Sequence, residues 1–188
     1  MFENPHEVHD WLAEQSNNSH FYMQVLHLHW MRSPSTEKRY LSILTKLADE
    51  LQLYPFVVRD LILRGNWKNH LIGNAVAILQ QRTQFEQDLA ECLLGNDNRI
   101  ASRLAAGFAL LTNGKSVFQL ENYLAQVDEA TSPNISLATY AALKFIGNDK
   151  AREFELLPIF KTLQANDRYD CLKNAEIHYK YWQGVLAK

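Results

Sequence analysis

Two stretches of the chain, HLIGNAVAILQ (70–80) and RLAAGFALLT (103–112), superpose when one is shifted by 32 residues. Ile72 then aligns with Leu104. A further shift of 35 residues places ISLATYAALKFI (135–146) over the second stretch. A period of roughly 30–37 residues built from two helices is typical of stacked helical hairpins. This period predicts the architecture of most of the chain.

Each copy of the repeat follows an amphipathic segment: FVVRDLILRG, FEQDLAECLLG or VFQLENYLAQV. The repeat therefore consists of a first amphipathic helix, a short turn and a second helix rich in Ala, Gly and Leu. Small residues on that second helix allow close packing against neighbouring helices. Examples are Gly73, Ala105, Ala106, Gly107, Ala141 and Ala142.

Helical spacing extends over nearly the whole chain, with Pro and Gly at the boundaries. Pro5 follows Asn4, and Gly147 ends an apolar segment, as expected for helix starts and ends. Residues 24–30 alternate like a strand, but a lone strand would have no partner, so a helix is favoured there. Pro158 either kinks the helix around it or splits it in two. Helices are predicted over 5–16, 19–31, 36–52, 55–64, 67–81, 83–94, 98–112, 116–127, 134–146, 150–165 and 169–186.

These patterns predict an all-α protein with a single domain over residues 1–188. Residues 1–35 would form N-terminal helices, and residues 36–188 about four antiparallel hairpins stacked as a short α-solenoid. The period and the helix character of 36–188 resemble those of HEAT and armadillo-like repeat proteins, and Pro158 resembles the proline kink of HEAT units. The alternative is a non-repetitive bundle whose alanine-rich helices are alike by chance.

Composition and charge limit which cellular compartment and which class of binding partner are expected. The 188 residues carry 19 basic and 21 acidic side chains, a net charge of −2, without a basic block. Nucleic acid is therefore an unexpected partner, because a phosphate binder needs a clustered positive field. The N-terminus is not a signal peptide, and no apolar run has the roughly 20 residues needed to cross a bilayer. A cytoplasmic protein without a membrane partner is expected.

Sequence motifs for catalysis are missing. There is no HExxH, no GxSxG and no phosphate-binding glycine loop, and the only Glu-x-x-His, from Glu3 to His6, is interrupted by Pro5. Cys92 is expected to be a buried, inert thiol, and aspartates near Cys171 are expected to raise its pKa. We therefore predict no enzyme, no metal and no cofactor.

Paired carboxylates allow two interpretations. They are either a solvated outer face or an acidic docking patch for a basic partner. The groups concerned are Asp49/Glu50, Glu86/Asp88/Glu91, Asp128/Glu129 and Glu153/Glu155.

The sequence favours a protein-binding module that uses the second helices and the aromatic last helix. Size, helical class and charge are similar to those of bacterial immunity proteins, which implies an antidote that binds a cognate toxin, with a basic toxin domain as a candidate partner. The predicted protein-binding residues are Asn69, His70, Arg103, Tyr140, Lys144, His178 and Tyr181.

Two alternatives remain at this point. One is a base-excision glycosylase on a helical-repeat scaffold, in which Trp67, Lys68, Arg99 and Arg103 would contribute to a basic groove. The other is a helical transcription regulator, which ranks last because residues 1–50 hold seven acids against few basic residues.

Overall fold

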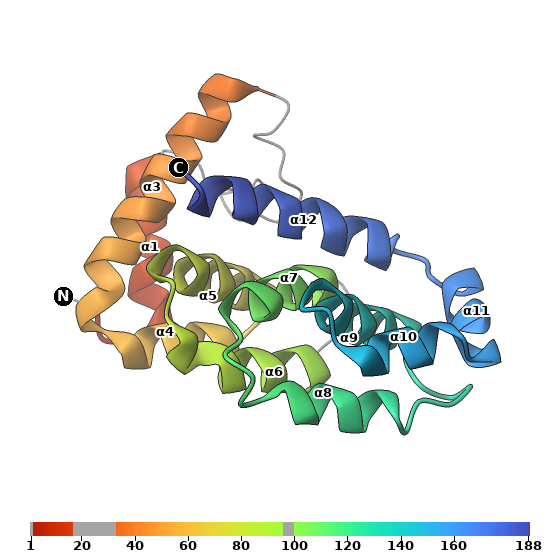
Figure 1. Ribbon diagram of the computed structural model, residues 1–188. Coiled ribbons are helices and arrows are strands. Elements are labelled where there is room, and N and C mark those ends of the chain that lie inside the picture. The colour runs from red at the N-terminus through yellow and green to blue at the C-terminus, as the bar shows by residue number, and fades with distance from the viewer. Residues whose placement is uncertain (1, 17–32, 96–99) are drawn as a thin grey trace. The chain divides into compact units, whose positions relative to one another are not determined.

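A computed structural model describes residues 2–16, 33–95 and 100–188, and this part of the chain contains helices but no strand (Figure 1). The predicted all-α class is confirmed for it. The ambiguous residues 24–30 and the helix predicted at 19–31 lie outside the described residues. The chain divides into two compact units, 1–82 and 83–188, which are described separately below. The single-domain organisation stays a prediction.

The first unit contains α1 (Pro5–Ser16), α3 (Pro34–Glu50), the short 3₁₀ helix η2 (Leu51–Leu53), α4 (Pro55–Leu63) and α5 (Trp67–Gln80). Local sequence explains these starts. Prolines occupy the first turns of α3 and α4, where a missing N–H costs nothing. The side chain of Asn66 caps α5 by accepting a hydrogen bond from the N–H of Lys68.

Helix α5 lies at the centre of the first unit and packs against both α3 and α4. Every residue from 69 to 78 is buried. The contact with α4 depends on Gly73, because a Cβ atom there would lie only 2.8 Å from the backbone nitrogen of Ile62. The expectation that this small residue allows close helix packing is confirmed.

The second unit begins with the 3₁₀ helix η3 (Thr83–Phe85). It continues through α6 (Glu86–Gly95), α7 (Ala101–Leu111), α8 (Val117–Leu124), α9 (Pro133–Phe145), α10 (Asp149–Glu155), α11 (Pro158–Ala165) and α12 (Cys171–Leu186). The segment predicted as one helix over 150–165 is two helices. Leu157 is extended, with φ −75° and ψ 142°, and Pro158 opens α11. The splitting role considered for this proline is therefore correct.

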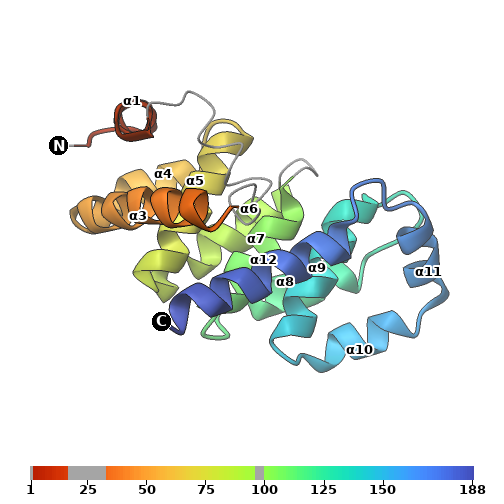
Figure 2. The same cartoon turned by 90° about the horizontal axis from the view of Figure 1, so that it is seen from above.

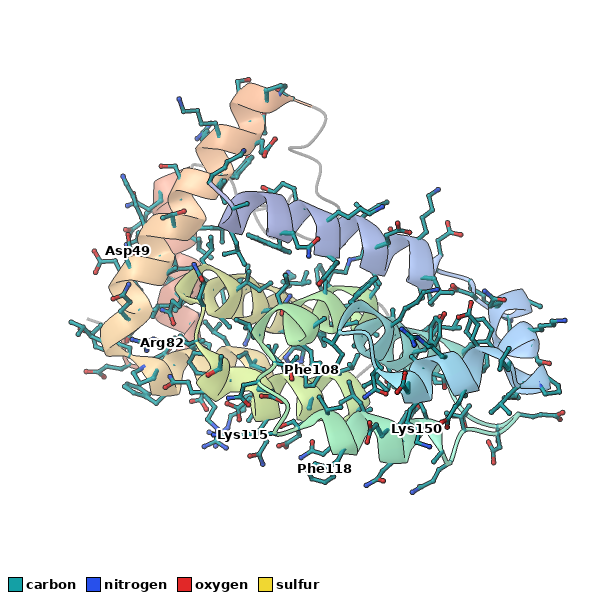
Figure 3. The ribbon with its side chains drawn as sticks, viewed as in Figure 1. Asp49, Arg82, Phe108, Lys115, Phe118 and Lys150 are labelled. Carbon is teal, nitrogen blue, oxygen red and sulfur yellow. The ribbon has the colours of Figure 1, made fainter. Side chains whose placement is uncertain are left out.

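Helices α7 and α9 form the core of the second unit. They pack against each other, and α12 packs against both of them (Figures 1 and 2). On the other sides, α6 packs against α7 and α8 against α9. Residues 101–109 of α7 are all buried, and Figure 3 shows Phe108 in this interior. The α7–α9 pair is thus covered by helices on several sides.

Candidate functional site

The structure places the predicted binding residues mostly inside the protein. Lys144 is exposed and Tyr181 is half-buried. The outward orientation expected of the other five is wrong. Neighbouring helices cover α5 in the first unit and the α7–α9 pair in the second, and His178 is buried on α12, which packs against α7 and α9. These five, with their exposed fractions, are Asn69 (9%), His70 (3%), Arg103 (8%), Tyr140 (2%) and His178 (4%).

Asn69 and His70 connect helices of the first unit. The Nδ1 atom of His70 lies 2.7 Å from the backbone oxygen of Ile62, near the C-terminus of α4, and donates to it. Burial lowers the pKa of His70, so the neutral ring is favoured. Asn69 accepts a hydrogen bond from Nε2 of His9 at 2.6 Å and donates one to the backbone oxygen of Arg64 at 3.2 Å. Both side chains therefore have a structural role, because they connect α5 to α1 and to the end of α4.

Arg103 belongs to a buried polar cluster in the second unit. Its Nη1 donates to Oγ of Ser102 at 2.8 Å, and burial lowers the pKa of its guanidinium. Nearby, Sγ of Cys171 donates to the backbone oxygen of Asn134 at 3.3 Å. Burial, and secondarily Asp167, raises the pKa of Cys171 to about 12. The expected direction of this pKa shift is confirmed, and the thiol is protonated rather than nucleophilic.

Tyr140 and Lys144 form a second group, on α9. The Lys144 amine donates to the Tyr140 hydroxyl at 2.9 Å and lies 3.8 Å from a carboxylate oxygen of Glu155. The Tyr140 ring packs against Phe160, with ring centroids 4.7 Å apart. Burial also raises the pKa of Tyr140. Through Glu155 and Phe160, this group connects α9 to α10 and α11.

Two of the paired carboxylates are not on the surface. Glu86 is 2% exposed and Asp88 is 6% exposed, so neither a solvated face nor a docking patch describes them. Glu86 accepts hydrogen bonds from the Thr112 hydroxyl and from the N–H groups of Asn113 and Ser116. It therefore anchors the connection between α7 and α8. The remaining acids, Asp49, Glu50, Glu91, Asp128, Glu129, Glu153 and Glu155, are exposed.

The structure reveals an exposed apolar group that the sequence analysis missed. Leu53, the last residue of η2, and Phe56, in the first turn of α4, are 81% and 53% exposed. Tyr54, between them, contacts the rings of Phe2 and Phe56 edge-on, with centroids 6.0 and 6.3 Å away. The signal was the run LQLYPF (51–56), in which apolar residues continue across the boundary between the helices predicted over 36–52 and 55–64.

We name the exposed side chains of Asp49, Glu50, Leu53 and Phe56 the 49–56 surface. It combines two carboxylates with two large apolar groups. Lys46 and Arg59 are exposed nearby in the sequence, so the surroundings carry both signs of charge. This arrangement suits recognition of a protein, in which apolar anchors give affinity and charges give selectivity.

The described residues include no group of three or more His, Cys, Asp or Glu side chains placed to hold a metal ion. Among the described helices, none is long and apolar enough to cross a membrane.

Comparisons with protein-family models, curated proteins and solved structures find no match. The resemblances to HEAT and armadillo-like repeats and to immunity proteins therefore stay predictions.

Proposed function

We propose that the protein is a non-catalytic protein-binding module of the immunity type, which neutralises a cognate bacterial toxin by direct binding in the cytoplasm. The observation that carries this proposal is the 49–56 surface. Large aromatic and aliphatic side chains in contact with water are the usual anchors of protein interfaces. Phe56 is supported by its contact with Tyr54, so its ring loses little freedom on binding.

The partner that suits this surface has an apolar pocket bordered by basic residues. Leu53 and Phe56 would enter the pocket, and Asp49 and Glu50 would attract the basic rim and raise the association rate. Because Lys46 and Arg59 are also exposed, charge alone would be a poor selector, and the apolar anchors would supply most of the affinity.

We also infer that the helix pairs are hairpins of a short HEAT-like solenoid. Support comes from the packing of α6 on α7 and of α8 on α9, and from the contact between α7 and α9 that would join consecutive hairpins. In this arrangement α12 would cover α7 and α9, which are the second helices of two hairpins, and binding would use a different surface.

The burial of Arg103 within the second unit counts against the glycosylase alternative, because this residue was expected to contribute to the basic groove. Arg99 lies outside the described residues.

A photo-crosslinking amino acid at position 56 tests the proposal, with position 118 as the matched control. Phe118 is an exposed phenylalanine of α8, 55% exposed against 53% for Phe56 (Figure 3). In the native host, the probe at 56 should capture one protein that the probe at 118 does not. The captured protein, purified separately, should bind with a Kd that Phe56→Ala raises by on the order of tenfold or more, as for a central anchor.

The immunity role has its own readout. Expression of the captured protein alone should arrest bacterial growth, and coexpression with this protein should restore growth, less so with Phe56→Ala than with Phe118→Ala. Equal capture at both positions, or restoration that Phe56→Ala leaves unchanged, would contradict binding through the 49–56 surface. A captured protein that is harmless when expressed alone would contradict the immunity role.

A further inference from the structure

The connection between α7 and α8 carries the dipeptide Asn113-Gly114 at the surface of the second unit. Both residues are exposed, as is Lys115, which Figure 3 labels in the same connection. A Cβ atom on Gly114 would meet nothing within 4 Å, so the space around this glycine is open. Because residue 114 has no side chain, nothing on it shields its backbone nitrogen from the side-chain amide of Asn113.

The backbone N–H of Gly114 begins a chain of hydrogen bonds that ends on a buried carboxylate. It donates to Oγ1 of Thr112 at 3.1 Å, and the Thr112 hydroxyl donates in turn to Oε1 of Glu86 at 2.8 Å. Glu86 is only 2% exposed. The proton of the Gly114 nitrogen therefore has an acceptor in place, which is what a weak nucleophile requires. The bond to Thr112 does not block attack, because an amide nitrogen reacts from above its plane.

The side-chain amide of Asn113 is held as an electrophile by the same turn. The N–H of Lys115 donates to its Oδ1 atom at 3.3 Å, which polarises the carbonyl and stabilises negative charge that develops on this oxygen. The backbone N–H of Asn113 donates to Oε2 of Glu86 at 2.9 Å, so the main chain is fixed at this residue. The turn thus combines a nucleophile, a route for its proton and a polarised amide.

We propose that Asn113 is a site of self-catalysed deamidation. The Gly114 nitrogen forms a bond to Cγ of Asn113 and gives up its proton through the Thr112 hydroxyl. The side-chain nitrogen takes up a proton and leaves as ammonia, and a cyclic succinimide remains. Water then opens this ring at either carbonyl, so that residue 113 becomes aspartate or isoaspartate. Water is the only co-reactant.

The reaction would weaken the anchor that Glu86 provides. Isoaspartate inserts a methylene group into the main chain between the N–H groups of residues 113 and 116, which both donate to Glu86. Either product also brings a new carboxylate to the turn, and like charges repel. The site therefore limits how long the native second unit persists, independently of the proposed binding function.

Peptide mass spectrometry of the full chain tests this site after incubation at neutral pH with and without guanidinium chloride. The Asn113 amide should be lost faster in the folded protein than in denaturant, where the hydrogen-bond chain is absent. Labelling by an isoaspartate methyltransferase should place the isomerised product at residue 113. Asn122, an exposed asparagine of α8, is the internal control and should stay intact over the same period.

Thr112→Val separates the catalysed reaction from the ordinary reactivity of an Asn-Gly pair. It should slow deamidation of the folded protein by about tenfold, as for one hydrogen bond lost in the transition state, and leave the rate in denaturant unchanged. Thr45→Val, at an exposed position of α3, should alter neither rate. Deamidation of Asn113 that is no faster in the folded protein than in denaturant, or a folded Thr112→Val protein that reacts at the unaltered rate, would overturn the inference.

The effect on stability has a separate readout. Incubation should lower the urea midpoint of the unaltered protein and leave that of Asn113→Gln unchanged, because glutamine would need a larger ring to react. An equal fall of the midpoint in both proteins would show that ageing acts elsewhere and would contradict the role given to this site.

Discussion

A carboxylate oxygen of Glu86 lies 2.7 Å from the backbone nitrogen of Ser116, 30 residues further along the chain. The same side chain accepts from the Thr112 hydroxyl at 2.8 Å and from the N–H of Asn113 at 2.9 Å. A single buried acid thus holds the whole connection between α7 and α8. Because the N–H of Ser116 is buried and has this carboxylate as its acceptor, the role of Glu86 is structural.

Substitution of Glu86 should destabilise the folded protein. We expect Glu86→Gln to lower the free energy of unfolding by about 2–3 kcal/mol, because the amide accepts with one oxygen only and lacks the charge that strengthens these bonds. Urea unfolding followed by circular dichroism measures the change. Glu91→Gln, at an exposed position of the same helix, is the control and should be neutral. Equal effects of the two substitutions would contradict the anchoring role of Glu86.

The helix contact at Gly73 should not tolerate a methyl group. In Gly73→Ala the new Cβ would lie 2.8 Å from the Ile62 nitrogen and 2.9 Å from its Cγ1 atom. We expect a loss of about 1–3 kcal/mol in unfolding free energy, as for other overpacked cores. Gly184→Ala is the matched control, because a Cβ there meets nothing within 4 Å. It should stabilise α12 by about 0.5–1 kcal/mol.

His70 should make stability dependent on pH. Its pKa is lowered in the folded protein by burial, so the unfolded chain binds a proton at a higher pH than the folded one. Stability from this group is complete above the unfolded pKa of about 6.5 and decreases as pH falls from there towards the folded pKa. Unfolding free energies measured between about pH 7.5 and 5 should therefore fall with pH more steeply for the unaltered protein than for His70→Asn. Parallel curves would contradict the assignment.

The thiol of Cys171 should resist modification while the protein is folded. With a pKa of about 12 and 2% exposure, it is protonated and shielded at pH 8. Cys92 is equally buried, at 1% exposure. An aromatic disulfide reagent should therefore react with both thiols only after denaturant is added. Rapid reaction of the native protein would show that the second unit opens more readily than its packing indicates.

Asn134 should be dispensable for stability, in contrast to Asn69. Among the residues that the structure describes, Oδ1 of Asn134 has no hydrogen-bond partner. Asn134→Ala therefore removes an unfavourable buried group and should leave the unfolding free energy unchanged or raise it by about 1 kcal/mol. Asn69 is paired at both ends of its amide. We expect Asn69→Ala to cost about 1–3 kcal/mol. Thermal unfolding of the two variants side by side makes the comparison, and a larger loss for Asn134→Ala would show an unseen structural role.

The helices and most of their ends could be predicted because the signals are local. A proline in the first turn, an asparagine cap or a glycine past the last turn acts within a few residues. Gly65, Gly114 and Gly147, for example, have φ angles of 94°, 95° and 74° in the left-handed region. The prediction of one helix over 150–165 was wrong, because periodicity continues across Pro158 although the backbone does not.

Exposure could not be predicted in the same way. Helices such as α5, α7 and α9 are apolar on nearly all sides, so their sequence pattern does not indicate which face is exposed to solvent. Arg103 and His178 look like surface residues by type but are buried in the second unit, where α12 packs on α7 and α9. A cavity in the second unit is likewise lined by residues 129–134 together with residues between 159 and 169, which come together only on folding.

The sequence alone thus determined that the chain is helical and where most helices begin and end, because those choices depend on neighbours along the chain. Only the tertiary structure decided which polar groups are buried and which apolar groups remain in water, because burial depends on the helices that pack against each face. Leu53 and Phe56 illustrate the second case: in the described part of the chain their side chains are 81% and 53% exposed.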